Sequence, residues 1–333
     1  MRKHIVALLA LLAWAAAAPA VAADSAVVLM YTRFNDDRFP AASVDLDQFE
    51  AHVAELKAGG ATVLPLPEIV AALKSGTPLP DRAVAITLDE AGASAYRLAW
   101  PRLKAAGLPF TLFVATDGID RGAEAMSWDQ LRELAASPLV TIGSHGSGRA
   151  RLATLPAEEI AADLRRSRGR FETELGRVPE LLAWPLGEAS AEAEETAARA
   201  GFVAAFGQHS GAVWSRADRY FLPRFSLNQT YGQADRFRLT VGALPLQAID
   251  ITPADPRLST NPPAFGFTLA DEKATEGLAC YSSVDGRLML ERLGPRVEIR
   301  ATRPFPSGRI RINCTAPSLD SRWRWFGWQF SVP

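Results

Sequence analysis

Short apolar runs alternate with stretches of helical periodicity between Ala26 and about Gly207, and this alternation constrains the fold more than any other feature of the chain. The apolar runs are VVLMY, TVLPL, VAITL, FTLFV, VTIG, LLAWP and FVAAFG. Strands separated by helices pair in parallel, because parallel neighbours need a crossover connection. The sequence therefore predicts an α/β fold, either a closed or nearly closed β/α barrel or an open doubly wound sheet.

Two of the intervening helices carry start signals. Ser127 and Gln130 have the spacing of a capping box, in which the two side chains satisfy first-turn amides. A second helix is expected after Thr154 and Pro156. Its apolar positions recur near the helical period at Ile160, Leu164, Phe171 and Leu175. Both helices are expected to pack on the sheet.

The pattern of the sequence changes after Tyr231. From about Asp250 onward, turn signals separate strand-like stretches, which are FGFTL, ACYSS, RLMLERL, RVEIRATR, GRIRINCT and WRWFGWQFSV. We therefore expect an α/β domain over residues 25–235, a linker over 236–255, and a small all-β, sandwich-like domain over 256–333.

The N-terminus has the order of a secretory signal peptide. Arg2 and Lys3 precede an apolar stretch from Ile5 to Ala18, and small residues follow up to Ala22. We expect residues 1–22 to be removed and the mature protein to be exported, periplasmic or secreted, with no membrane span. A retained anchor is the alternative.

Charge and cysteine content narrow the partners and the compartment. A formal net charge of -1 provides no basic surface for nucleic acid and no polybasic face for anionic lipid. Cys280 and Cys314 are the two cysteines of the chain, and in an exported protein a disulfide between them is expected. Two unpaired buried thiols are the alternative, because spacing alone does not set the Cα separation.

Candidate functional residues fall where predicted strands end. Asp89 and Glu90 follow VAITL, and would face opposite ways if extended geometry continued. One carboxylate could then act as a base while the other binds a cation, whereas the alternative is a solvated acidic turn. His145 and Pro185 follow two other strands, and parallel sheets gather their functional groups at such carboxyl ends.

Six segments taken in order make a more specific pattern. They are VAITLDEAGASAYRLAWPRLKAAGLPFTLFVAT, SWDQLREL, SHGSGRARL, LAWPLGEAS, AAFGQHSG and LPRFSL. In order and spacing this set resembles the polysaccharide deacetylase family, the carbohydrate N-deacetylases with a NodB-type homology domain. The resemblance covers roughly residues 27–227 and stops before the predicted all-β domain.

The resemblance implies a fold and a chemistry. The fold is a distorted β/α barrel that holds one divalent metal, usually zinc, through an Asp-His-His set. A preceding aspartate acts as the base on the metal-bound water, which attacks the acetamide carbonyl of an N-acetylhexosamine unit. A Lewis acid and waiting hydrogen-bond donors suit that reaction.

Position by position, the metal motif is only partly present. Asp89 matches the family's base, Glu90 falls where the metal-binding aspartate stands, and His145 matches the first metal histidine. Arg149 occupies the place of the second metal histidine. Arg149 could pair with Glu90 and replace the charge of the metal, or it could point to solvent on a flexible Gly146/Gly148 loop.

At the other motif positions, this chain also matches the family only in part. Leu186, next to Pro185, stands where the family usually has a tyrosine whose backbone amide serves the oxyanion. Ala183 replaces the arginine that often begins that motif, and Thr32 replaces the histidine often found after the first-strand tyrosine. Only a side chain is lost at Leu186, since the amide remains.

Four histidines occur in the chain, so few can complete a metal site. His4 lies in the leader, and His52 is expected to be solvated on a helix. His209 has three interpretations: a metal ligand that swings into the vacant position, a general acid, or a plain loop residue.

Tryptophans beside the expected cleft and near the C-terminus have two interpretations each. Trp184 either stacks on a sugar ring or forms part of the barrel wall. Trp323, Trp325 and Trp328 either form an exposed glycan platform or pack in a core.

Two functions follow from these residues. The first is an exported carbohydrate deacetylase, a hydrolase that removes N-acetyl groups from an N-acetylhexosamine polymer with a divalent metal, most often zinc. The second is a catalytically degenerate deacetylase fold that binds glycan or serves exopolysaccharide machinery, with no metal. The losses in the metal motif leave open whether the protein is an enzyme.

Overall fold

The computed structural model describes residues 22–148, 151–271 and 276–333. The leader predicted for residues 1–22 lies outside the described residues except for its last position, and so does Arg149. Within the described ranges, no helix is both long and apolar enough to cross a membrane.

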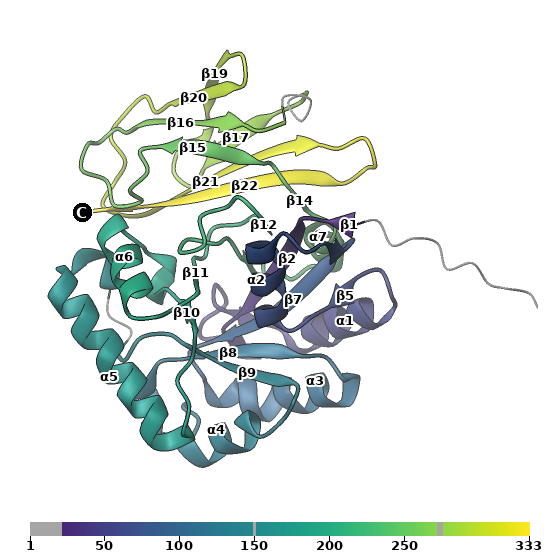
Figure 1. Ribbon diagram of the computed structural model, residues 1–333. Coiled ribbons are helices and arrows are strands. Elements are labelled where there is room, and N and C mark those ends of the chain that lie inside the picture. Colours follow the sequence, from purple (N-terminus) through teal and green to yellow (C-terminus); the bar gives the residue numbers. More distant parts are fainter. Residues whose placement is uncertain (1–21, 149–150, 272–275) are drawn as a thin grey trace, which may run out of the picture.

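Nine strands form one curled sheet in the α/β part of the molecule (Figure 1). Their bounds are β2 Ser25–Tyr31, β5 Thr62–Val63, β7 Ala83–Asp89, β8 Phe110–Val114, β9 Val140–Ser144, β10 Leu181–Ala183, β11 Ala204–Phe206, β12 Ala212–Trp214 and β13 Phe225–Ser226. The order is β11-β10-β9-β8-β7-β2-β12, with β5 beside β7 and β13 beside β2. All pairs are parallel except β12 with β2. The seven predicted runs are all strands of this sheet, which is curled and open-edged.

Helices cover both faces of the sheet. They are α1 Leu46–Lys57, α2 Leu66–Ser75, α3 Trp100–Ala106, α4 Trp128–Ala135, α5 Ala157–Leu175, α6 Ala191–Arg199 and α7 Ala234–Val241. Short strands also pair outside the main sheet, β1 Ala22–Ala23 with β6 Leu79–Pro80 and β3 Arg33–Phe34 with β4 Ser43–Val44. The alternation seen in the sequence thus becomes a layered α/β structure.

Strand β2 shows why the apolar runs are continuous. Val27 and Leu29 pack in one core cluster with residues of α1, α3 and α4, whereas Ala26 and Val28 pack in another with residues of α2. Successive side chains of a strand point to opposite faces, so a strand buried on both faces is apolar at every position.

Both helix start signals are confirmed. The Gln130 amide donates to Ser127 Oγ at 3.2 Å, and the Ser127 amide donates to Gln130 Oε1 at 3.0 Å, so α4 begins with the expected capping box. Helix α5 begins after Pro156. Its Ile160, Leu164 and Phe171 are fully buried.

The chain after α7 forms two antiparallel-rich sheets, which we call the C-terminal sheets. One has the order β14-β22-β21-β17-β18 and the other β15-β16-β20-β19. The bounds are β14 Leu244–Pro245, β15 Ala248–Thr252, β16 Ala264–Leu269, β17 Ala279–Ser282, β18 Gly286–Arg287, β19 Met289–Leu293, β20 Arg296–Arg300, β21 Gly308–Pro317 and β22 Trp323–Val332. Phe265 lies 5.2 Å from Phe330 and Phe267 lies 4.9 Å from Phe326, ring centre to ring centre, so the two sheets pack face to face.

Residues 236–255, which the sequence suggested as a linker, are structured. Most of α7 lies there, and Phe237 and Val241 are buried in the α/β core. β14 and β15 also lie in this interval, in the C-terminal sheets. Elements this short carry too few residues to show a periodicity, which is why the sequence pattern missed them.

The disulfide is present between Cys280 and Cys314. The two residues are direct partners across β17 and β21, with Cα atoms 4.0 Å apart, and both are fully buried. The alternative of two unpaired thiols is therefore wrong.

Candidate functional site

The strand ends of the curled sheet bring the sequence-predicted residues to one edge. Asp89 is the last residue of β7, His145 follows β9, and Pro185 lies just after β10. Because β7, β8, β9 and β10 are neighbours and parallel, their carboxyl ends lie on the same edge.

Asp89 is held by an arginine that the sequence analysis did not single out. Arg224 Nη1 lies 2.7 Å from Asp89 Oδ1, and Nη2 lies 2.8 Å from Oδ2. Both side chains are buried, with exposed fractions of 0% for Arg224 and 1% for Asp89. A guanidinium that binds both carboxylate oxygens fixes the orientation of the carboxylate and balances its charge.

Two further N–H groups of Arg224 are also used. Its Nε donates to the Gly207 carbonyl at 2.9 Å and its Nη1 to Thr87 Oγ1 at 3.1 Å, while the guanidinium lies 5.3 Å from the Phe113 ring centre. Arg224 is the arginine of LPRFSL, and arginine inside an apolar run is rarely buried without a partner. That signal could have identified it. Ala183, at the position where the family often has an arginine, is buried in β10.

Glu90 has left-handed backbone geometry, with φ of 75°, and so has Ala91, with φ of 51°. The strand geometry therefore ends at Asp89, so the condition under which the two carboxylates were expected to face opposite ways is not met. The Glu90 amide donates to the Phe113 carbonyl at 2.9 Å, which holds the turn. Non-glycine residues in this region cost about 1–3 kcal/mol each and cluster at functional sites.

His145 is buried and its loop is anchored. The His145 amide donates to the Val114 carbonyl at 2.9 Å. The Ser147 amide donates to Asp163 Oδ1 at 2.9 Å, and Arg166 Nε donates to Ser147 Oγ at 3.0 Å. A Cβ at Gly146, whose φ is 73°, would lie 2.8 Å from Asp163 Oδ1, so the first glycine permits a close approach.

The ligand set does not match a complete catalytic metal site. Glu90 and His145 are the two family metal positions among the described residues, and these residues contain no group of three His, Cys, Asp or Glu side chains that could hold a metal ion. Catalytic zinc normally has three protein ligands. Arg149, which stands in place of the next ligand, lies outside the described residues, so its pairing with Glu90 stays a prediction.

The turn after β10 contains the predicted oxyanion amide. Leu186 has φ of 60° and Gly187 has φ of 67°. Gln329 Nε2 donates to the Leu186 carbonyl at 3.2 Å and to the Gly187 carbonyl at 2.8 Å, and Arg309 Nη1 donates to the Leu186 carbonyl at 3.3 Å. The C-terminal sheets therefore hold the backbone of this turn.

Trp184 and Pro185, predicted to bind substrate, are buried. The Trp184 side chain has no exposed surface, and its Nε1 donates to the Tyr220 carbonyl at 2.7 Å. Trp184 is thus a core residue, and of the two interpretations the sugar-stacking one is wrong. Its indole has its polar atom satisfied inside the protein, which is typical of a buried tryptophan.

His209, considered as a metal ligand or general acid, is connected to Arg224, whose amide donates to the His209 carbonyl at 2.9 Å. It is buried beside the Phe221 ring at 4.3 Å, at the contact with the C-terminal sheets. Burial, together with the nearby charges of Arg311 and Arg224, lowers the pKa of His209 to about 3. A histidine that stays neutral at physiological pH does not serve as a general acid, and no described metal group includes it.

His52, expected to be solvated, is also buried. Its Nδ1 lies 3.0 Å from the Tyr31 hydroxyl, its Nε2 lies 2.7 Å from the Gly232 carbonyl oxygen, and its ring stacks on Phe237 at 3.9 Å. Burial lowers the pKa of His52 to about 4. The expectation was wrong because both ring nitrogens of His52 have hydrogen-bond partners inside the protein, which allows this helical residue to be buried.

A polar hollow of about 420 Å³ opens at the strand-end edge. Arg33, Asp117, Arg121, Glu124 and Gly148 are among its lining residues. They follow β2, β8 and β9, and half-buried Thr32 precedes Arg33. The hollow lies on the same edge of the sheet as Asp89 and His145, although neither of these residues lines it.

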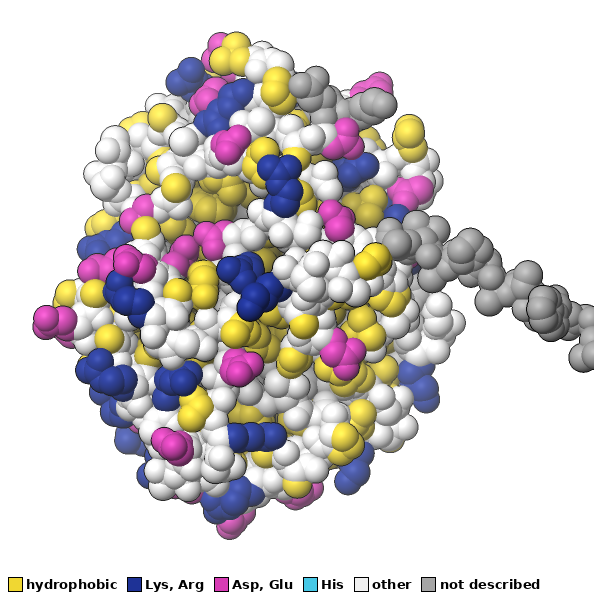
Figure 2. All heavy atoms as spheres, viewed as in Figure 1, with side chains coloured by type: hydrophobic (Ala, Val, Ile, Leu, Met, Phe, Trp, Pro, Cys, Tyr) yellow, Lys and Arg dark blue, Asp and Glu magenta, His cyan; other side chains and the backbone are white. Residues whose placement is uncertain are grey.

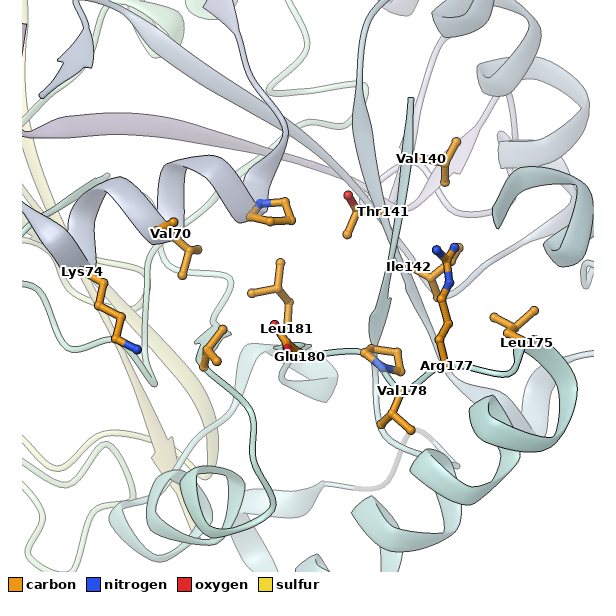
Figure 3. Close-up of a pocket in the computed structure, with 14 residues that line it drawn as sticks. Val70, Lys74, Val140, Thr141, Ile142, Leu175, Arg177, Val178, Glu180 and Leu181 are labelled. Carbon is orange, nitrogen blue, oxygen red and sulfur yellow. The ribbon is translucent and has the colours of Figure 1, made fainter. Parts of the chain in front are cut away.

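A different cavity, of about 400 Å³, lies at the opposite edge (Figure 3). Val140, Thr141 and Ile142 of β9 line it together with Glu180 and Leu181. These residues are at the amino ends of β9 and β10, which pair only at Leu182 and Ser144. None of the candidate site residues lines this cavity, so we do not assign it to the site.

Fold and site together define an α/β protein whose polar residues gather at the carboxyl ends of a curled, largely parallel sheet. Residues 76–205 match the model of the polysaccharide deacetylase family. The chain therefore carries a polysaccharide deacetylase domain over these residues.

Curated relatives carry the same family's activity in their names. A poly-beta-1,6-N-acetyl-D-glucosamine N-deacetylase of Staphylococcus aureus strain MSSA476 is 24% identical over 198 residues, which are 56% of this chain and 68% of that protein. The protein of that name from Escherichia coli K12 is 26% identical over 217 residues, 53% of this chain and 32% of that protein.

Solved structures share the fold. The Streptococcus pyogenes deacetylase PplD, in complex with acetate, has a TM-score of 0.60 at 19% identity and covers 65% of this chain and 98% of its own. IcaB from Ammonifex degensii has a TM-score of 0.58 at 24% identity and covers 66% of this chain and 98% of its own. At these identities the likeness shows a common fold.

Proposed function

We propose that this chain hydrolyses N-acetyl groups of an N-acetylhexosamine-containing glycan. The observation that carries the proposal is the buried, two-point pairing of Asp89 with Arg224 at the carboxyl end of β7. A fixed carboxylate at this place suits a base that takes a proton from an attacking water. The names of the relatives support an N-acetylglucosamine polymer as the substrate class.

Two parts of this chain would act on the acetamide. Asp89 would accept the proton of the attacking water and return it to the leaving amine nitrogen as the C–N bond breaks, which releases acetate. The backbone amide of Leu186 would donate to the oxygen that becomes negatively charged. The bonds from Gln329 and Arg309 to the turn support a fixed direction for that amide. Because the described residues do not complete a three-ligand metal set, we assign no step to a metal.

The incomplete metal-ligand set favours a second candidate function. Glu90 and His145 lack a third partner ligand among the described residues, and Arg149 stands in the motif where the family has a histidine. A guanidinium is always charged and cannot ligate a cation. In this case the chain would bind glycan, or serve exopolysaccharide machinery, without turnover.

The test combines acetate release with metal content. The purified protein is incubated with poly-β-1,6-N-acetylglucosamine or chitooligosaccharides, with and without Zn²⁺ or Co²⁺, beside Asp89→Asn. Acetate released by the wild type and lost in Asp89→Asn supports hydrolysis, and bound metal that disappears in His145→Ala assigns a metal to that site. Glycan binding without acetate under every condition would establish the second function.

We also propose that the protein is exported, to the periplasm or outside the cell. The leader pattern of residues 1–22 supports this proposal. The buried Cys280–Cys314 disulfide supports it as well, because disulfides persist in oxidising compartments. Cell fractionation with an antibody against the chain would test it, and a cytoplasmic protein with reduced cysteines would contradict it.

A further inference from the structure

A cavity of about 530 Å³ lies where the α/β part meets the C-terminal sheets, and we call it the seam cavity. Its walls come from β12, from the segment that precedes β13, and from β14, β15 and β22. Figure 1 shows β22 crossing above β12 and β2 at this place. The volume falls within the range of about 300–1,000 Å³ that is typical of small-molecule sites.

Aromatic rings dominate the walls of the seam cavity. Trp214, Phe221, Trp325, Phe326 and Trp328 all line it. The Phe221 and Trp328 rings are perpendicular, with centres 5.2 Å apart. Such walls suit a ligand with a flat apolar face, since packing on an aromatic ring removes apolar surface from water.

Two buried polar atoms on these walls have no hydrogen-bond partner. They are Nδ1 of His209 and Nε1 of Trp328, on side chains with exposed fractions of 2% and 5%. By contrast, the indole nitrogens of Trp184 and Trp325 donate to the Tyr220 carbonyl and to Asn313 Oδ1. A buried polar group without a partner destabilises a fold, so this pair requires an explanation.

The two atoms form a complementary pair. The His209 Nδ1 has no partner, and a neutral imidazole can present this nitrogen as an acceptor. The Trp328 indole nitrogen is a donor only. The two ring centres lie 6.2 Å apart, so one small molecule can contact both. A hydroxyl group is the simplest partner, because it donates and accepts at once.

We propose that the seam cavity binds a neutral pyranose ring, which stacks on the tryptophans and places one hydroxyl between Trp328 Nε1 and His209 Nδ1. The charged lining residues have both signs, since Arg216 is positive and Asp218 and Asp250 are negative, which favours a ligand without a large net charge. This site differs from the strand-end hollow, whose lining residues it does not share. The proposal does not rest on deacetylase activity.

Indole N–H signals test the proposal directly. The ¹⁵N-labelled protein is titrated with N-acetylglucosamine or methyl β-glucoside, and Trp328→Phe and Trp323→Phe assign two of the indole cross-peaks. We expect the Trp328 peak to shift saturably at millimolar sugar, while the peak of exposed Trp323 stays in place. Mannitol, which has hydroxyls but no ring, should bind at least about tenfold more weakly. An unmoved Trp328 peak, equal shifts at Trp323, or equal binding of mannitol would overturn the proposal.

Variants test the hydroxyl bridge. Trp328→Phe removes the donor and His209→Phe removes the acceptor, and each should weaken sugar binding about 3- to 10-fold, as expected for one hydrogen bond. Binding is followed at the Trp325 indole signal, and a thermal melt verifies that each variant is folded. If His209→Phe does not fold, Trp328→Phe alone provides the test. Unchanged affinity would refute the bridge. Glu90→Gln, at the strand-end site, should leave sugar binding at the seam cavity unchanged, which separates this inference from the proposed function.

Discussion

Asp89 and Arg224 form a two-point ion pair in which neither side chain reaches solvent. The residues are 135 positions apart in the chain. A buried ion pair of this kind contributes less to stability than the loss of one partner removes, because the surviving charge is left buried without compensation.

Arg224→Met should therefore destabilise the protein by about 3–5 kcal/mol. The double variant Asp89→Leu/Arg224→Met should cost less than the two single changes together, since neither charge remains. Urea denaturation of all four proteins in a double-mutant cycle measures the coupling. Additive losses would mean that the two residues do not interact.

Gln329→Leu tests the hold of the C-terminal sheets on the Leu186 turn. Two carbonyl oxygens and Arg311 Nε lose the Gln329 side chain as a partner, so we expect the free energy of unfolding to fall by about 1–3 kcal/mol. If the protein is active, kcat should change more than KM. Chemical denaturation measures the first effect and acetate release the second. Arg309→Ala, at an exposed residue of β21 that bonds the same Leu186 carbonyl, is the comparison. It should lower the free energy of unfolding by no more than about 0.5 kcal/mol.

Glu194 should make the protein less stable as the pH rises. Acidic side chains gather where α6 meets the C-terminal sheets (Figure 2), and burial, together with Asp218 and Asp255, raises the pKa of Glu194 to about 9. The folded protein then holds a proton that the unfolded chain releases above about pH 4.5. The contribution of protonated Glu194 to the free energy of unfolding is therefore lost as the pH rises from 4.5 to 9. Glu194→Gln should flatten the decline of Tm over this range. Glu195→Gln, on the exposed side of α6, should not, and parallel wild-type and Glu194→Gln profiles would contradict the assignment.

His52 should have the opposite pH dependence. Its pKa is lowered from 6.5 to about 4 by burial, so the unfolded chain takes up a proton that the folded protein refuses as the pH falls through this window. The contribution of neutral His52 to the free energy of unfolding is therefore complete above pH 6.5 and declines towards pH 4. The decline amounts to about 1–2 kcal/mol at pH 5. His52→Phe should lose less stability than the wild type between pH 7 and pH 5 in urea denaturation. An equal loss would show that His52 is not the titrating group.

The strand and helix pattern was predictable because it depends on local order. The seven apolar runs became strands of one sheet, and the capping box of Ser127 began α4. Parallel strands then had to bring Asp89 and His145 to a common edge, so the neighbourhood of the site also followed from the sequence.

The backbone at the site was not predictable in the same way. Glu90 and Leu186 have left-handed geometry although neither is glycine, and only the bonds to Phe113 and Gln329 show what holds them. No local preference of these residues favours that conformation.

What the sequence by itself determined is the alternation of elements, the family motif and its departure at Arg149, since each depends on residues close together in the chain. Tertiary structure alone decided that Arg224 pairs with Asp89, that His52 and His209 are buried, and that Gln329 braces the turn at Leu186. Each of these contacts joins segments far apart in sequence. Whether a polar side chain meets a partner or water depends on which surfaces the sheets bring together, and periodicity carries no information about that.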